Sequence, residues 1–158
     1  MQKGTYVHDM CRLYLLNNLD EDNLDPVLVP YLDAFKLFLL QSKGMGIVGC
    51  FDIKSGSHHP CVELQIAAYV DLINNGIPMS ATESNIILEM PFYHPIYQYA
   101  GTPDIVIFDK KPVKEGHALY LKDNGKYSLK SVDNIRKNFE MFLQFLNTER
   151  WKKEHNLM

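Results

Sequence analysis

The chain has 158 residues, of which 46% are hydrophobic and 22% are charged, and its formal net charge at pH 7 is −3. This length and composition are typical of a single folded domain over residues 1–158 with one core, and they exclude a disordered chain. Because no apolar run is long enough to cross a bilayer and the N-terminus lacks a basic segment followed by an apolar one, we expect a cytoplasmic protein without a membrane partner.

Three cysteines are present, Cys11, Cys50 and Cys61. An odd number of cysteines without a signal peptide predicts reduced thiols, and three cannot supply the four ligands of an iron–sulfur cluster. Cys50, His58, His59 and Cys61 also form a Cys/His group, but their spacing fits no common zinc module. A zinc protein is therefore a distant alternative.

The first half of the chain predicts three helices and one strand. Apolar residues recur at helical spacing in three segments, and a run of apolar and β-branched residues lies between the second and the third. Such a run is typical of a strand that is covered on both faces. Asp25 is predicted to cap the second helix and Pro26 to be its first residue. The predicted elements are helices over residues 5–19, 26–41 and 63–74 and a strand over residues 46–54.

The second half of the chain predicts two β-hairpins and a final helix. Two apolar segments flank a turn at residues 94–98, and Asp123-Asn124-Gly125 is a strong signal for a tight hairpin turn. Together with the first half, this predicts an α/β fold with a small mixed sheet flanked by helices. The predicted elements are strands over residues 85–93, 99–108, 117–122 and 126–130 and a helix over residues 132–150.

Asp52 and Lys54 are two charged residues within the apolar strand predicted over residues 46–54. Alternation along a strand places both on one face, and burying either charge without a partner is costly. A carboxylate there can bind a hard divalent cation such as Mg²⁺, and a lysine beside it can orient or deprotonate a water or stabilise charge on a phosphate. The alternative is a salt bridge with a structural role only.

Asp104 is the second candidate carboxylate. It follows Gly101-Thr102-Pro103 at the start of an apolar strand, where the alternative is an aspartate that caps a turn. Glu89, on the partner strand of the same hairpin, is a weaker candidate. Its alternative roles are those of a metal ligand, a residue that contacts the metal ligands, or a surface residue.

Four short motifs together resemble those of the PD-(D/E)XK nuclease superfamily. The two motifs that contain Asp104 and Lys54 are similar to the signature of the superfamily. The two that contain His8 and Tyr69 are similar to marks of its RecB-like branch, which includes phage-type exonucleases. Residues 24–39 and 119–129 also resemble parts of phage-type exonucleases. Each motif is weak alone, so the resemblance depends on their coincidence. The motifs are Pro103-Asp104, Asp52-Ile53-Lys54, Gly4-Thr5-Tyr6-Val7-His8 and Gln65-Ile66-Ala67-Ala68-Tyr69.

The resemblance implies a restriction-endonuclease-like core that hydrolyses phosphodiester bonds in single- or double-stranded DNA with Mg²⁺ or Mn²⁺. It further implies an exonuclease of phage-like replication or recombination. The alternative is a nucleic-acid-binding module of the same fold that has lost cleavage. The resemblance implies metal binding for Asp52, Asp104 and the Ile53 carbonyl, and for His8 the role of a metal ligand or a close neighbour of the metal. It implies a place beside the attacking water for Lys54, and positioning of the strand or of the lysine for Gln65 and Tyr69.

Two further features bear on a DNA partner. Most lysines and arginines fall between residues 110 and 153, either as a solvated surface or as a face that contacts phosphates. The order of the motifs also departs from the family, where the Gly-Thr-Pro-Asp hairpin normally precedes the Asp-x-Lys strand. Either the later hairpin takes the same place in the sheet through permuted connectivity, which we favour, or Asp104 cannot reach the metal. The second case predicts a chain that is inactive alone or completed by another copy in a homo-oligomer.

Overall fold

The computed structural model describes residues 3–80, 86–107 and 112–157. A five-stranded sheet is formed by β1 (Gly49–Lys54), β3 (Ile86–Leu88), β6 (Ile105–Ile107), β7 (Gly116–Leu121) and β8 (Tyr127–Ser131). The strand order is β3-β6-β1-β7-β8, in which β1 runs parallel to β7 and all other neighbours are antiparallel. The sheet is therefore mixed, and β1 lies at its centre.

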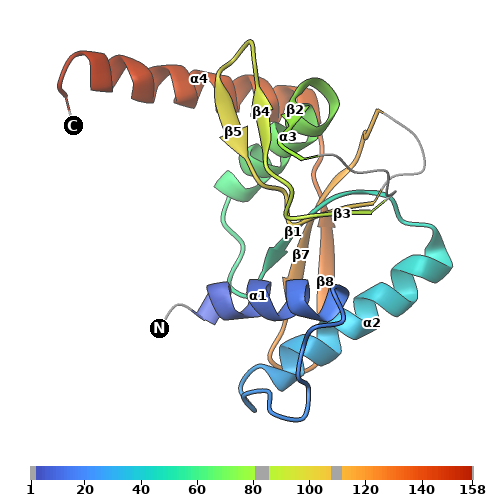
Figure 1. The fold of residues 1–158 in the computed structure, drawn as a ribbon. Coiled ribbons are helices and arrows are strands. Elements are labelled where there is room, and N and C mark those ends of the chain that lie inside the picture. Colours follow the sequence, from blue (N-terminus) through green and yellow to red (C-terminus); the bar gives the residue numbers. More distant parts are fainter. Residues whose placement is uncertain (1–2, 81–85, 108–111, 158) are drawn as a thin grey trace.

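Helices cover both faces of this sheet (Figure 1). Helices α1 (Lys3–Leu15) and α2 (Val29–Met45) pack on one face. Helix α3 (Cys61–Asn75) packs on the other face, with α4 (Ile135–Glu154) outside it. Phe51 and Ile53 lie in the core under α1 and α2, whereas Cys50 lies in the core under α3. By alternation, Asp52 and Lys54 face α3.

Residues 86–107 form one long hairpin that leaves the five-stranded sheet and enters a second one. Its outer part consists of β4 (Phe92–His94) and β5 (Tyr99–Gly101), and β2 (Ile77–Pro78) pairs with β4 to complete a three-stranded sheet. The pairing register is continuous from one sheet to the other. Ile86 pairs with Ile107 and His94 pairs with Tyr99, and the number of residues between these two pairs is the same on both strands. The predicted hairpin around residues 94–98 is confirmed, with residues 85 and 108 outside the described part.

The predicted start of the second helix is wrong. Asp25 closes a turn instead of capping the helix: its Oδ1 accepts a hydrogen bond from the Val27 N–H at 2.9 Å, and its carbonyl oxygen accepts one from the Leu28 N–H at 2.8 Å. Helix α2 begins at Val29, so Pro30 stands in its first turn, where the missing N–H leaves no hydrogen bond unmade. Pro26 lies in the preceding turn.

Other boundaries shift for local reasons. Helix α1 ends at Leu15, before the predicted residue 19, because Asn17 takes a φ of 55°. Helix α2 runs to Met45, beyond the predicted residue 41, and Gly46 ends it with a φ of 62°. The strand predicted from residue 46 begins at Gly49. The last helix begins at residue 135 and ends at residue 154, and the remaining predicted elements agree within one or two residues. In the described part of the chain, no helix combines the length and apolarity that crossing a membrane requires.

His94 is a buried side chain that ties the outer end of the hairpin to α3. It is 2% exposed, and its Nε2 lies 3.2 Å from the Asp71 carboxylate. Its Nδ1 accepts hydrogen bonds from the N–H groups of Ile96 and Tyr97, both at 3.2 Å. Both ring nitrogens therefore have fixed partners, and the ring holds the turn and the helix together.

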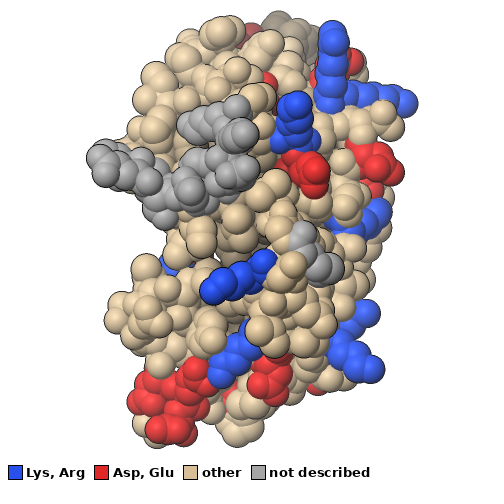
Figure 2. Space-filling model, turned by 90° about the vertical axis from the view of Figure 1, so that its right-hand side faces the viewer, with Lys and Arg blue, Asp and Glu red and all other residues tan. Residues whose placement is uncertain are grey.

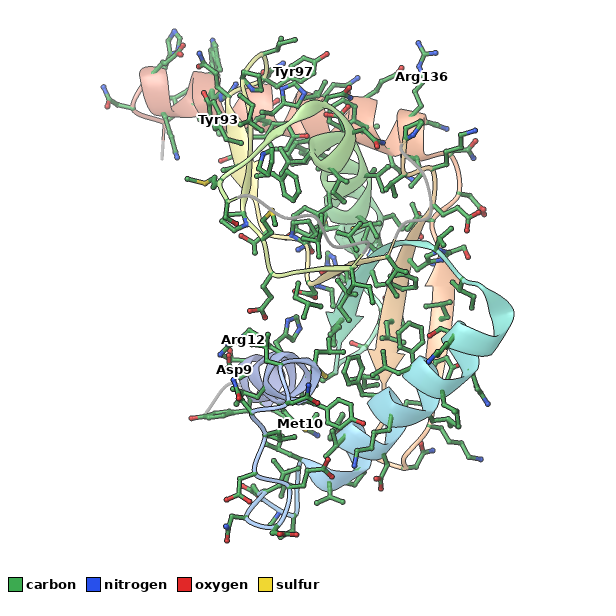
Figure 3. All side chains as sticks on the ribbon, turned by 45° about the vertical axis from the view of Figure 1, so that its right-hand side comes forward. Asp9, Met10, Arg12, Tyr93, Tyr97 and Arg136 are labelled. Carbon is green, nitrogen blue, oxygen red and sulfur yellow. The ribbon has the colours of Figure 1, made fainter. Side chains whose placement is uncertain are left out.

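We expect His94→Ala to lower the free energy of unfolding by about 2–4 kcal/mol, because it opens a cavity and leaves buried polar groups unpaired. Tyr93→Ala is the matched control, since Tyr93 precedes His94 on the same strand, is 40% exposed and lies at the same end of the molecule (Figure 3). The control is expected to cost less than about 1 kcal/mol. Urea denaturation measures both, and equal losses would show that the contacts of His94 contribute nothing specific.

Candidate active site

The residues singled out in the sequence come together at the end of β1. The β1–β6 register pairs Phe51 with Ile105, and one further step places Asp104 opposite Asp52. The hairpin that follows α3 along the chain therefore lies beside the strand that carries Asp52 and Lys54. The contributing elements are α1 with His8, β1 with Asp52 and Lys54, α3 with Gln65 and Tyr69, and the residue before β6, Asp104.

The Asp104 carboxylate is held between β1 and α1. Its Oδ2 accepts a hydrogen bond of 2.7 Å from the Ile53 N–H, and its Oδ1 lies 3.3 Å from Nδ1 of His8. The hydrogen bond to Asp104 raises the pKa of His8 against the opposing effect of burial. In a strand the N–H and C=O of one residue point toward the same neighbour, so the Ile53 carbonyl also faces the β6 side.

Asp52 is a buried carboxylate, 2% exposed, with one cation beside it. Nζ of Lys54 lies 2.7 Å from Asp52 Oδ2 and forms an ion pair with it. Among the described residues, no donor other than the Lys54 ammonium reaches this oxygen. Burial raises the pKa of Asp52 to about 6, the Lys54 ammonium opposes this rise, and the negative charge of Asp104 adds to it. This end of β1 therefore favours an additional positive charge.

A chain of side chains on α3 fixes the Lys54 ammonium. Its Nζ donates a long hydrogen bond of 3.4 Å to Oε1 of Gln65, and Nε2 of Gln65 donates one of 2.9 Å to the Tyr69 hydroxyl. Gln65 and Tyr69 stand one helical turn apart on one face of α3. The two residues therefore support the lysine, which is one of the two roles that the resemblance implies for them.

Gly101 on β5 lies against the ring of Tyr69. A Cβ atom at this position would be 2.8 Å from Cε1 of Tyr69, closer than real Cβ contacts come. Glycine is thus required here by close packing. Any side chain would displace the ring of Tyr69, the last residue in the series of hydrogen bonds that begins at Lys54.

We expect Gly101→Ala to destabilise the protein by about 1–3 kcal/mol through overpacking. Gly44→Ala is the contrasting variant, because Gly44 lies in α2 and a Cβ there meets nothing within 4 Å. It is expected to stabilise the protein by about 0.5–1 kcal/mol, the usual advantage of alanine over glycine in a helix. Thermal unfolding of both variants tests the opposite signs, and a stabilising Gly101→Ala would contradict the close approach.

Glu89 is near Asp104 through its backbone, not through its carboxylate. Its N–H donates to the Asp104 carbonyl oxygen at 3.0 Å, whereas its Oε2 lies 3.2 Å from Nε of Arg12. Arg12, which the sequence interpretation missed, lies close to Asp9 on α1 (Figure 3), with their charged groups 3.8 Å apart. The available signal was its spacing, since Arg12 follows His8 by four residues and shares its helix face.

The carboxylates of Asp52 and Asp104, together with the Ile53 carbonyl oxygen, are suitable ligands for a hard divalent cation, because Mg²⁺ and Mn²⁺ accept carboxylate and carbonyl oxygens. Asp52 Oδ2, which is buried and has only the Lys54 ammonium as a partner among the described residues, is the observation that favours a further cation here. No group of three or more His, Cys, Asp or Glu in the described ranges is arranged to hold a metal ion. Mg²⁺ does not require one, since it is commonly bound by one or two carboxylates with water and phosphate.

Four of the nine late basic residues that the structure describes are paired with acidic groups or backbone oxygens. Lys130 lies 2.8 Å from Glu63, and Arg150 donates to the Tyr97 and Gln98 carbonyl oxygens. On the side shown in Figure 2, the lysines and arginines that the structure describes are scattered among acidic residues. On this side, the solvated-surface interpretation fits them better than a continuous phosphate-contacting face, and residues 110 and 111 lie outside the described part.

The expected site residues thus divide into two groups. Direct contacts link Asp52, Lys54, Gln65 and Tyr69 in one set, and His8, Asp104 and the Ile53 N–H in a second set, which meets the first at the neighbouring residues Asp52 and Ile53. The Glu89 carboxylate, by contrast, is paired with Arg12. Cys50 is buried in the core and Cys61 is exposed at the start of α3. Comparison of the chain with family models, with curated proteins and with solved structures found no match.

Proposed function

We propose that this chain is a divalent-metal-dependent nuclease that hydrolyses phosphodiester bonds in DNA. The observation that carries the proposal is the position of Asp104, far along the chain from Asp52 yet opposite it and bonded to the Ile53 N–H. A structural salt bridge needs only Asp52 and Lys54 and gives no reason for a second carboxylate there. Like charges opposite each other on neighbouring strands repel, so the arrangement favours a bound cation.

Each side chain has a role in this proposal. Asp52, Asp104 and the Ile53 carbonyl would hold Mg²⁺ or Mn²⁺, with His8 orienting Asp104. When bound, the ion would lower the pKa of a water and polarise the phosphodiester. Lys54 has three N–H donors, of which Asp52 and Gln65 occupy two positions, so one remains for a phosphate oxygen or the attacking water. The narrower proposal, an exonuclease of phage-like replication or recombination, depends on the resemblance.

We expect the wild-type protein to cleave end-labelled single- or double-stranded DNA with Mg²⁺ or Mn²⁺ and not with EDTA. Lys54→Met should reduce the rate by about a hundredfold or more, because it removes a cation placed for transition-state charge. Lys43→Met, at an exposed position on α2, is the matched control and should cleave like wild type. Placing the label at the 5′ or the 3′ end gives the polarity. Cleavage that persists in EDTA, or in Lys54→Met at the wild-type rate, would contradict the proposal.

A DNA-binding module without cleavage is the second candidate. The observation that favours it is that Lys54 and His8 already lie against the two carboxylates, so the negative charges are neutralised without a metal. This function predicts DNA binding that is independent of divalent cations and no cleavage under any of the conditions above. The same experiment, with binding measured by fluorescence anisotropy, therefore separates the two functions.

A further inference from the structure

An apolar groove opens beside the candidate active site, between α3, β5 and α4. Its volume is about 470 Å³, within the range of small-molecule binding pockets. Four of its ten lining residues are aromatic, and one of them, Phe145 on α4, is 57% exposed. The aromatic lining residues are Tyr69, Tyr99, Phe142 and Phe145. The groove therefore combines an apolar lining with aromatic side chains, the residue type on which planar rings stack.

The groove is continuous with the site at Lys54. Gln65 and Tyr69 line the groove, and the same two residues form the chain of hydrogen bonds that starts at the Lys54 ammonium. A ligand that places an anionic group at Lys54 and extends along α3 thus reaches the aromatic walls next. A nucleotide has this arrangement, with a phosphate at one end and a planar base at the other.

We propose that the groove binds one nucleobase of the DNA strand whose phosphate lies at Lys54. This inference depends on the proposed nuclease function and adds the state of the substrate to it. Aromatic side chains stack on any base without sequence preference, because every base has a π-face. A base in the groove cannot be paired, so the nucleotide beside the cleaved phosphate must be single-stranded, either in a single strand or at a frayed end.

The test measures the affinity of the full chain for fluorescein-labelled single-stranded oligonucleotides, with Ca²⁺ in place of Mg²⁺ to prevent cleavage. Phe145→Ala should raise the Kd for a normal strand about tenfold, the usual order of one base-stacking contact. The variant should leave the Kd unchanged for a strand that lacks the base bound in the groove. A scan of single abasic sites along the strand identifies which position this is. Phe145→Leu, apolar without an aromatic face, should lose most of the same affinity.

Trp151→Ala is the matched control, because Trp151 is an exposed aromatic residue on the same helix, 52% exposed and outside the groove. It should bind both strands like wild type. If Phe145→Ala binds normal and abasic strands like wild type while wild type cleaves DNA, the groove proposal fails and the nuclease function stands. If wild type neither binds nor cleaves DNA, both fail. If Phe145→Ala changes only the sedimentation of the protein, the groove is an interface between copies, and the proposal is overturned.

Discussion

Asp52→Asn is expected to abolish DNA cleavage and, at about pH 8, to make the protein more stable. Burial raises the pKa of Asp52 from 3.8 to about 6, so at neutral pH the fold holds a charged carboxylate in a place that favours a neutral group. A shift of this size corresponds to about 3 kcal/mol. Because the raised pKa already includes the opposing effect of the Lys54 ammonium, we expect a gain of about 2–3 kcal/mol in the free energy of unfolding.

The gain should depend on pH in a defined direction. Because the pKa of Asp52 is higher in the folded state, its protonated form favours folding, and this advantage is present below pH 3.8 and lost as the pH rises through about 6. The stability difference between Asp52→Asn and wild type should therefore be largest near pH 8 and small near pH 4. Urea denaturation at several pH values measures it, with the exposed Asp22→Asn as the matched control.

The opposite sign would be equally informative. If Asp52→Asn is less stable than wild type at pH 8, the ion pair with Lys54 stabilises the fold, and the structural interpretation of this pair gains support. A variant that is more stable but inactive is the pattern expected where a site keeps an unfavourable charge for function. Stability and cleavage together therefore decide between the two interpretations of Asp52.

The sequence predicts the helices and strands well, and it also predicts the part of the site that lies on β1 and α3, because local periodicity determines both. Phe35 and Phe38 recur at helical spacing and are fully buried in α2 as expected. Alternation alone places Asp52 and Lys54 on one face of β1, and the helical spacing of Gln65 and Tyr69 places them together on α3. These relations involve neighbours along the chain, so they need no knowledge of tertiary contacts.

The partner of the hairpin in the sheet could not be predicted in the same way. The turn and strand signals predict that residues 86–107 fold back on themselves, but nothing local states that β6 pairs with β1. The division of the hairpin between two sheets is also a tertiary effect, and it falls where Glu89 takes a φ of 41° opposite Asp104. Similarly, the apolar spacing of α4 indicates its packed face, but not that Phe145 borders an open groove.

Asp104→Asn is expected to lower the cleavage rate by at least ~10³-fold while leaving the fold intact, as for other residues that act within a catalytic unit. An asparagine oxygen can still accept the hydrogen bond that Oδ2 receives from the Ile53 N–H at 2.7 Å. Asp104→Ala removes this acceptor, leaves the N–H without its partner, and should also cost about 1–3 kcal/mol of stability. Glu89→Gln is the matched control, because its carboxylate is paired with Arg12, and its rate should fall less than tenfold.

The titration of His8 gives a result that does not depend on cleavage. Its contact with Asp104 is the main cause of its raised pKa, so NMR should show a lower pKa for His8 in both Asp104 variants. A lower pKa with cleavage at the wild-type rate would make Asp104 a partner of His8 only and would contradict its role in the site. If the pKa of His8 is lower and cleavage is lost, Asp104 acts in the site although its hairpin follows α3 along the chain. The position of a strand in the sheet, and not its order along the chain, would then determine whether its carboxylate serves the site.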